Sequence, residues 1–494
     1  MFCVFNIANH LLKYKSLIKN FMKLLKICSL SFIYLLTSCT SDDLVPQDKS
    51  IESTMNQSFS RMNINSDFVT NEKNLNIIYF VPNDNPEVEG YQDRLSELLI
   101  YFQTWMKNEM NRNGYGDKTF GLPLNTLTGK VNIITIKGKE GQAAYDYGSS
   151  SKILAEINQY KTQHSSEFSS NYHNLIILPQ RKDGGRQPFY GFTDGALKGI
   201  CFAVDNSNIK VSEIATTTSN YIGGMLHELG HGLGLPHNSE KVSEKNVLGT
   251  ALMGGGNGTF GRKPTFLTTG SAAILDKNEI FQPQVIPGIS YYDKGSYTID
   301  AKLSYDPILK KIIVNGTFTS SIPVSKALLW LDPNTENAVG VNKDYNSIVW
   351  PVNVNGNTIY GEVPVDELFV KGNTMYEYKI RLLQNNGVLL ESILYFNFLN
   401  NQVIDPAKSV VFFQNCNYNG SGYWKSLTEG AYTTQDLINA GIKDNDISSI
   451  RPASGYKVSL YDGNNFSGEL FTVTNNTSCQ FNERTSSLKI EKIN

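Results

Sequence analysis

The sequence predicts a multidomain chain in which one α/β domain is followed by two all-β domains. Three observations support this prediction. Up to about residue 285, apolar residues recur at both strand and helix spacing, whereas from about residue 290 short apolar runs alternate with Asn, Gly and Pro turns. A pattern of aromatic residues and glycine then repeats within residues 408–494. A chain of 494 residues has room for two to four domains.

The first 39 residues read as a targeting segment and are excluded from the fold. Basic residues follow Met22, which can itself be the start, and the apolar run that ends at Leu36 is too short to span a bilayer. Leu36-Thr37-Ser38-Cys39 resembles a bacterial lipobox, which implies acylation of Cys39 as the first mature residue. An ordinary cleaved secretory signal is the alternative.

Two features after Cys39 bear on where the protein resides. Asp42 and Asp43 resemble the acidic surface-export tag of Bacteroidetes-type lipoproteins. Residues 40–72 are polar and rich in Ser and Asn, which predicts a tether. We therefore expect a bacterial outer-membrane or cell-surface lipoprotein, held at the membrane by its lipid anchor, or a secreted protein.

Residues 73–285 are predicted to form the α/β domain. Leucines and methionines at helical spacing between Leu95 and Met110 predict an amphipathic helix that ends near Gly114. Four apolar runs have the length and composition of strands, at residues 76–81, 131–136, 174–179 and 199–204. Two further helices are expected, at residues 219–233 and 268–281.

Residues 227–237 read H-E-L-G-H-G-L-G-L-P-H and hold three of the six histidines in the chain. His227 and His231 are four positions apart, so on a helix both imidazoles can reach one metal ion. Gly234 can leave the helix with φ > 0 and return His237 to the same ion. Three neutral imidazoles on zinc leave a fourth position for water, as in catalytic sites. The alternative is a helix with core or solvent-exposed histidines, which the extended motif disfavours.

This motif resembles that of the metzincin zinc endopeptidases. Its sequence is closer to matrixin-like than to astacin-like motifs, because glycines follow Met253 where astacins have a His-Tyr pair. The resemblance implies a twisted mixed sheet with helices above a cleft, and a methionine turn at Met253 beneath the metal. An ordinary core methionine is the alternative for Met253.

The resemblance also implies roles in catalysis and substrate binding. Glu228 is expected to act as the general base, accepting a proton as the zinc-activated water attacks a peptide carbonyl. In the family an edge strand binds extended peptide by main-chain pairing, and we expect residues 199–204 to be that strand.

Residues 290–402 are predicted to form an immunoglobulin-like β-sandwich. Short strand-like runs at residues 311–314, 327–330, 358–360 and 376–380 are separated by turn residues at regular spacing. No catalytic signature occurs among them. We expect this domain to space the enzyme from the membrane or to contact substrate.

Residues 408–494 contain the pattern aromatic-x4-aromatic-x-Gly twice, as Phe413, Tyr418, Gly420 and as Tyr461, Phe466, Gly468. The repeat resembles the βγ-crystallin fold, a pair of Greek-key motifs. The glycine of each motif is expected to adopt a backbone conformation that other residues resist.

Each motif also has a polar run that resembles the calcium-binding sequence of that family. The first run matches fully, whereas the second has Glu483 where Asn or Asp is usual. Calcium prefers oxygen ligands, and the expected ones are Asp444, Asn445, Asp446 and Ser448 in the first run and Asn482, Glu483, Arg484 and Ser486 in the second. Hydrogen-bonded turn residues without metal are the alternative.

The cysteine count and the net charge limit the possible disulfides and binding partners of the chain. Three cysteines follow the leader, so at least one thiol is free. Cys416 and Cys479 fall in the same domain and can pair only if their Cα atoms come close enough. A net charge of −2 without a basic patch argues against nucleic acid. We expect a monomer.

The leading interpretation is an extracellular zinc-dependent endopeptidase with one catalytic zinc, bound calcium in the C-terminal domain, and a protein or glycoprotein substrate. A catalytically inactive binding lipoprotein, either an adhesin or a glycan-binding protein, is the first alternative. A structural calcium-dependent surface protein is the second. Glu228 favours the enzyme, because a binding scaffold has no need of that carboxylate.

Overall fold

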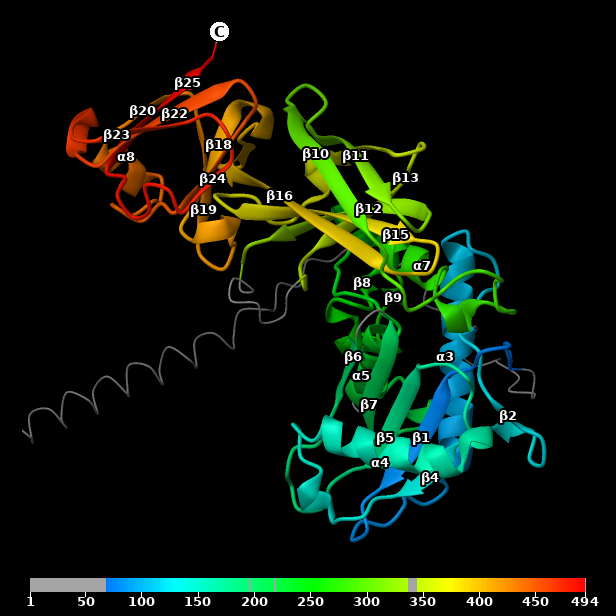
Figure 1. Ribbon diagram of the computed structural model, residues 1–494. Helices are drawn as coiled ribbons and strands as arrows, with labels where there is room; N and C mark the ends of the chain where they lie inside the picture. The colour runs from blue at the N-terminus through cyan, green and yellow to red at the C-terminus, as the bar shows by residue number, and fades with distance from the viewer. Residues whose placement is uncertain (1–67, 195–196, 217–218, 336–343, 494) are drawn as a thin grey trace, which may run out of the picture. The chain divides into compact units, whose positions relative to one another are not determined.

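The computed structural model describes residues 68–194, 197–216, 219–335 and 344–493 (Figure 1). Cys39, the rest of the predicted leader and most of the tether lie outside these ranges. Within them, no helix combines the length and the apolar composition that crossing a bilayer requires.

A five-stranded mixed sheet forms the centre of the first domain, in the order β4-β1-β5-β7-β6. The first four strands run parallel and β6 runs antiparallel to β7. Their bounds are β1 (Asn76–Val81), β4 (Ile134–Lys137), β5 (Asn174–Pro179), β6 (Tyr190–Asp194) and β7 (Lys198–Asp205). This arrangement confirms the α/β prediction.

Helices cover both faces of this sheet. Alternate residues of β1 enter different cores: Ile77 and Tyr79 pack with the long helix α3 (Tyr91–Arg112), whereas Ile78 and Phe80 pack with α4 (Ser150–Gln163). This follows from the period of two in a strand, which sends successive side chains to opposite faces. Both faces of β1 are therefore buried, as its continuous apolar run indicates.

Three details of the first domain differ from the predictions. The run 131–136 is divided, because β3 (Lys130–Val131) pairs with β2 (Leu124–Asn125) and only β4 joins the main sheet. The run 199–204 lies within β7, which has a neighbour on each side and is not an edge strand. The expected helix at 268–281 is broken into α7 (Thr269–Leu275) and the 3-10 turn η5 (Glu279–Phe281), since the Asn278 side chain accepts a hydrogen bond from Ile280 and starts a new turn.

One helix carries two of the three histidines. This helix is α5 (Ser219–Gly232), and it packs closely on β7 because a Cβ at Gly199 would lie 1.7 Å from the Gly232 carbonyl oxygen. After it come α6 (Val242–Leu248), β8 (Thr250–Ala251), η4 (Gly255–Gly258) and β9 (Thr265–Phe266).

Two further sheets form a β-sandwich. One is ordered β10-β11-β14 and the other β13-β12-β15-β16-β17. Their bounds are β10 (Tyr297–Asp306), β11 (Lys311–Ser320), β12 (Val324–Pro333), β13 (Ile348–Asn353), β14 (Thr358–Pro364), β15 (Met375–Gln384), β16 (Leu389–Leu399) and β17 (Gln402–Val403). Apolar side chains from both sheets share one core, which confirms a sandwich.

The sandwich also shares a core with the α/β domain. Leu328, Trp330, Val349 and Leu383 from the five-stranded sheet belong to the same buried cluster as α3, α5 and α7. A Cβ at Gly270 in α7 would lie 2.5 Å from Val349. The two domains are therefore joined by apolar packing and not only by the chain.

The C-terminal sheets exchange strands. Four strands follow β17 in each half, and the third strand of each half pairs in the sheet of the other, giving the orders β19-β18-β21-β24 and β20-β25-β22-β23. The bounds are β18 (Ser409–Phe413), β19 (Trp424–Thr428), β20 (Gly430–Tyr432), α8 (Thr434–Asn439), β21 (Ser449–Pro452), β22 (Tyr456–Tyr461), β23 (Leu470–Val473), β24 (Thr477–Ser478) and β25 (Ser487–Lys492). Such interlocked halves are Greek-key in character.

The repeated glycines of this region differ. Gly468 has φ of +81°, the left-handed conformation that was expected, but Gly420 does not lie in that region, so the expectation is wrong there. Two further residues of each corner are left-handed, Asn417 and Tyr418 in the first and Asn465 and Phe466 in the second.

The three cysteines after the leader form one disulfide and leave one free thiol, as their odd number requires. Cys416 and Cys479 form a disulfide with Cα atoms 5.4 Å apart, whereas Cys201 is free and buried. The disulfide joins the two halves of the C-terminal domain.

Candidate active site

The three histidines of the motif converge on one point. His227 and His231 lie one turn apart on α5 with ring centroids 4.8 Å apart. Gly234 has φ of +87° and turns the chain, so that His237 faces His231 with a distance of 3.0 Å between their Nε2 atoms. One ligand atom from each ring lies within 4.8 Å of the others.

Backbone carbonyls orient two of the rings. Nδ1 of His227 donates to the Leu252 carbonyl at 2.7 Å, and Nδ1 of His231 donates to the Leu235 carbonyl at 2.8 Å. A carbonyl can only accept, so each Nδ1 carries the proton and each Nε2 keeps its lone pair. Histidines that bind metals are held in this way.

Burial keeps these two imidazoles neutral. It lowers the pKa of His227 to about 4 and that of His231 to about 3. Neutral imidazole is the form that binds a metal ion. The donor set therefore fits a zinc ion, which takes three protein ligands in catalytic sites.

Met253 lies beneath α5, next to Gly230 and so between His227 and His231 along the helix. It is buried, and a Cβ at Gly230 would lie 2.5 Å from its sulfur. The preceding carbonyl, of Leu252, is the one that holds His227. The turn at Met253 thus supports the first histidine through its backbone.

Glu228 points to the edge strand β6. Its carboxylate accepts a hydrogen bond of 2.8 Å from the backbone N–H of Gly191. Burial raises the pKa of the Glu228 carboxyl to about 7, although the Gly191 bond favours the carboxylate. A carboxyl with this pKa can exchange a proton near neutral pH, which is what a general base requires.

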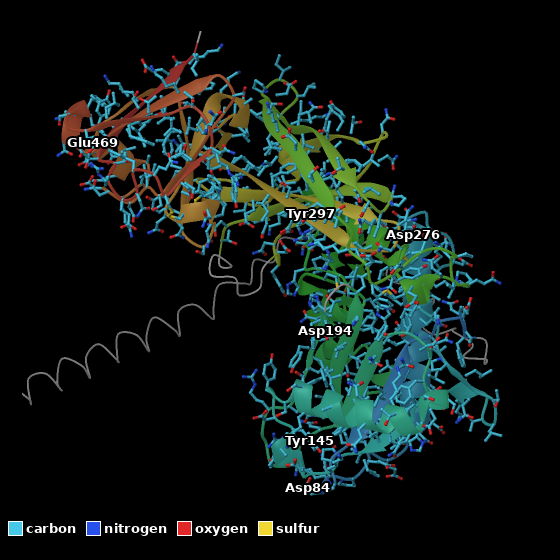
Figure 2. All side chains as sticks on the ribbon, in the orientation of Figure 1. Asp84, Tyr145, Asp194, Asp276, Tyr297 and Glu469 are labelled. Atoms are coloured by element: carbon cyan, nitrogen blue, oxygen red, sulfur yellow. A yellow bond between two sulfur atoms is a disulfide. The ribbon has the colours of Figure 1, made fainter. Side chains whose placement is uncertain are left out.

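Gly191 is required by the close approach of β6 to the helix. A Cβ at this position would lie 1.9 Å from the carbonyl oxygen of Glu228. Sequence analysis missed β6, because this half-buried strand lacks the continuous apolar run that marks the buried strands. The aromatic-glycine-aromatic run Tyr190-Gly191-Phe192 is the signal that could have indicated it. Asp194, at the end of β6, is labelled in Figure 2.

Tyr345 is a second residue that sequence analysis missed. It comes from the β-sandwich, and its ring centroid lies 5.0 Å from that of His237 at an interplanar angle of 61°. The sequence of the sandwich has no catalytic signature that would indicate Tyr345, because only the fold brings this residue to the histidines.

The residues expected to bind calcium lie together only in part. The Ser486 hydroxyl donates to the side chains of Asp444 (2.7 Å) and Asn445 (3.2 Å), which joins the first polar run to the second. Arg484 instead pairs with Asp462 and Glu469, and Asp446 accepts a hydrogen bond from Gln414. Asn482 lies beside Cys416, 3.5 Å from its sulfur.

The backbones of the two polar runs also pair with each other. Asn445 donates to the Thr485 carbonyl, and Glu483 donates to the Ile447 carbonyl. Both Asn445 and Glu483 have left-handed φ values, of +54° and +52°. Ser448 is buried, and its carbonyl accepts from the N–H of Cys479.

Three histidines that converge beside a half-buried carboxylate on an α/β domain are the residue set that metal-dependent hydrolases use. Comparison with solved structures identifies the family. Wild-type OgpA from Akkermansia muciniphila is 33% identical, with a TM-score of 0.61, and the match covers 68% of this chain and 97% of OgpA. The chain belongs to the family that includes OgpA.

A second OgpA structure is equally similar. It is a catalytically inactive OgpA in complex with an O-glycopeptide (glycodrosocin) substrate, at 32% identity and a TM-score of 0.61, over 69% of this chain and 97% of OgpA.

A βγ-crystallin domain from Flavobacterium johnsoniae is 31% identical over 17% of this chain and 93% of its own length, with a TM-score of 0.16. No family model and no curated protein sequence matches the chain.

Proposed function

We propose that this protein is a zinc-dependent endopeptidase that cleaves O-glycosylated peptides. The observation that carries the proposal is the cluster of three imidazoles, with ligand atoms within 4.8 Å of one another, on the helix that also bears Glu228. Membership in the family of OgpA supports it, because OgpA binds an O-glycopeptide as its substrate.

In this proposal the three histidines bind the metal ion and Glu228 transfers protons. A zinc ion held by His227, His231 and His237 would supply Lewis acidity and lower the pKa of water to about 7. Glu228 accepts the proton of the attacking water and returns a proton to the departing amine. The Gly191 N–H holds the Glu228 carboxylate at 2.8 Å, which fixes the base before substrate arrives.

The strand β6 is proposed to bind the peptide. It ends the order of the main sheet, so its outer edge can pair with an extended chain. This role replaces the one expected for residues 199–204. Because Gly191 belongs to β6 and contacts Glu228, a peptide on this edge lies beside the base.

We also propose, from the sequence, a lipid anchor on Cys39 and bound calcium in the C-terminal domain. Acylation of Cys39 would anchor the protein at the bacterial surface. Calcium bound by the two polar runs would hold together the two halves of the C-terminal domain, and the contacts between Ser486 and Asp444 support a shared site.

A pair of synthetic peptides that differ only in one O-linked sugar tests the proposal. Wild-type protein is expected to cleave the glycosylated peptide and to leave the bare peptide intact. Glu228→Gln should keep its zinc and lose about 10²- to 10⁴-fold in rate, the usual contribution of a general base. Mass spectrometry of the products and metal analysis of both proteins give the readouts.

The outcomes separate the alternatives. Cleavage by Glu228→Gln at the wild-type rate would exclude the role of Glu228. Tight binding of the glycopeptide by wild-type protein without cleavage would instead favour a binding lipoprotein. Equal cleavage of both peptides would contradict the preference for glycosylated substrate while leaving the peptidase assignment intact.

A further inference from the structure

The segment that precedes β13 in the sandwich reaches the histidine cluster. Its described part begins at Asp344, and the Tyr345 ring contacts that of His237 in an edge-type arrangement, with centroids 5.0 Å apart and an interplanar angle of 61°. His237 stands beyond the end of α5, so the helix backbone does not set the orientation of its ring. The ring contacts those of His227 and His231 and, from the sandwich, that of Tyr345.

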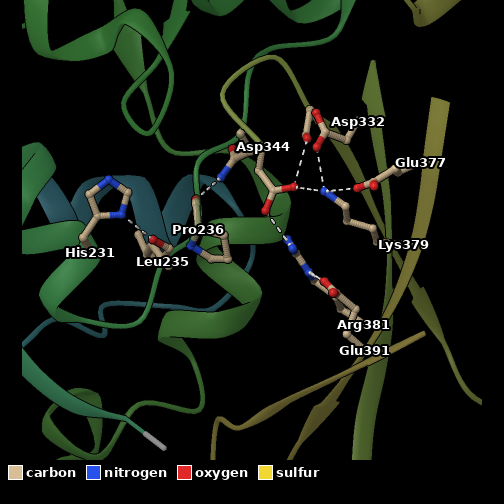
Figure 3. A network of polar contacts seen from close by, with 11 residues as sticks. His231, Leu235, Pro236, Asp332, Asp344, Glu377, Lys379, Arg381 and Glu391 are labelled. Atoms are coloured by element: carbon tan, nitrogen blue, oxygen red, sulfur yellow. Dashed lines mark hydrogen bonds and ion pairs between the residues drawn. The ribbon is translucent and has the colours of Figure 1, made fainter. Parts of the chain in front are cut away.

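The residue before Tyr345 is held by buried charges. The Asp344 carboxylate accepts from Arg381 Nη2 at 2.7 Å and also pairs with Lys379, and both partners stand on β15 in the middle of the five-stranded sheet (Figure 3). The Lys379 side chain is fully buried. Removing one partner from a buried ion pair is strongly unfavourable, so Asp344 is firmly held.

Other carboxylates complete the network around these cations. Lys379 also pairs with Asp332 at 2.6 Å and with Glu377 at 3.0 Å, and Arg381 pairs with Glu391 at 2.7 Å. Although burial opposes ionisation of Asp344, Arg381 and Lys379 hold the pKa of its carboxyl well below the usual range. Asp344 thus stays charged and attached at neutral pH.

The segment is attached on its other side to the chain that follows His237. The backbone N–H of Ser239 donates to the Ser347 carbonyl at 2.6 Å. The Lys241 ammonium lies 5.4 Å from the ring centroid of Trp350 on β13. His237 and Tyr345 are therefore held two residues from a hydrogen bond that joins their two segments.

We propose that Tyr345 is a positioning residue of the metal site and that the β-sandwich thereby supplies part of the metal centre. Contact with the Tyr345 ring fixes the plane of the His237 imidazole, which must point its lone pair at the ion to bind it. The inference rests on the proposed zinc site. Since coupling between sites is reciprocal, bound metal also restrains the segment at residues 344–347.

Substitutions at Tyr345 separate its ring from its hydroxyl. Tyr345→Phe keeps the ring and should bind zinc as wild type does. Tyr345→Ala removes the ring and should weaken zinc binding roughly tenfold, the lower end of the effect of removing a group that orients a ligand. Tyr345→Leu fills the volume without an aromatic ring and should resemble Tyr345→Ala, which guards against a loss due to a cavity alone.

Two measurements apply to each variant. Competition with a chromophoric chelator gives the zinc affinity, and the visible absorption spectrum of the cobalt-loaded protein reports the geometry of the ligands. Tyr360→Ala is the control, because Tyr360 is an exposed aromatic residue on β14 of the same sandwich. The control should retain the wild-type affinity and spectrum.

Wild-type zinc affinity and an unchanged cobalt spectrum in Tyr345→Ala would overturn the inference. A loss in Tyr345→Phe as large as in Tyr345→Ala would also overturn it, because the hydroxyl and not the ring would then be responsible. Failure of wild-type protein to take up zinc or cobalt is a different result, since it would remove the proposed function itself.

Discussion

The histidine cluster and the C-terminal polar runs are both proposed to bind metal ions, but they differ in how far their ligands are already arranged. In the cluster, backbone carbonyls fix the rings of His227 and His231, and a turn at Gly234 returns His237. In the polar runs, Ser486 joins Asp444, whereas Arg484 is engaged elsewhere.

The difference follows from the elements that carry the ligands. A helix places residues four apart on one face whatever else the fold does. A polar run in a loop has no such period, and its oxygen atoms depend on neighbouring strands and on the ion itself. A preformed site can therefore be predicted from residue spacing, whereas a loop site must be tested by adding the ion.

The largest effect is expected at the preformed site. His231→Ala removes the central imidazole of the cluster, so stoichiometric zinc and hydrolysis of the glycopeptide should both be lost. His164→Ala is a matched control, since His164 is an exposed histidine that pairs with Glu167 outside the cluster. Metal content per chain measures both variants, and a full zinc equivalent in His231→Ala would contradict the assignment.

A smaller effect is expected when calcium is added to the loop site. Binding to the folded state alone stabilises it by about 2.7 kcal/mol when calcium is at one hundred times its dissociation constant. Asp444→Ala should abolish this gain, because its carboxylate is bonded to the other run through Ser486. Thermal unfolding with calcium and with a chelator provides the measurement.

Glu491→Gln is the control for that experiment, because Glu491 is an exposed carboxylate of the same domain that pairs only with Lys457 among the ion pairs of the described residues. It should respond to calcium as wild type does. No shift in wild-type protein would favour turn residues without metal.

The smallest effect distinguishes the two halves of the C-terminal domain. Gly468→Ala places a side chain at φ of +81°, which costs roughly 1–2 kcal/mol in the left-handed region. Gly420→Ala should cost less, because Gly420 is outside that region and its nearest neighbour is the end of the Glu377 side chain. Chemical denaturation of both variants measures the difference, and equal losses would contradict the assigned backbone conformations.

Local patterns determined what the sequence could predict. The run of residues 76–81 became β1 and the run of residues 174–179 became β5, with the predicted bounds, because continuous apolar stretches between turn residues suit buried strands. The helix of the histidines and the turn at Gly234 were equally local. The aromatic repeat likewise indicated two Greek-key halves.

Tertiary relations account for what the sequence could not predict. The position of residues 199–204 inside the sheet depends on β6, which returns beside β7 and covers its edge. Gly191 matters because the helix passes above it, and Tyr345 matters because the sandwich packs on the α/β domain. No sequence pattern near Tyr345 indicates that this residue lies beside His237.

The shared core of the α/β domain and the sandwich has a practical consequence for dissecting the protein. Expressing residues 73–285 alone would uncover the apolar surface that Leu328, Trp330, Val349 and Leu383 now cover, and large exposed apolar patches promote aggregation. The smallest fragment worth purifying therefore extends through β17, because removing the C-terminal domain after it opens the smaller apolar cluster that contains Tyr395, Phe413 and Trp424.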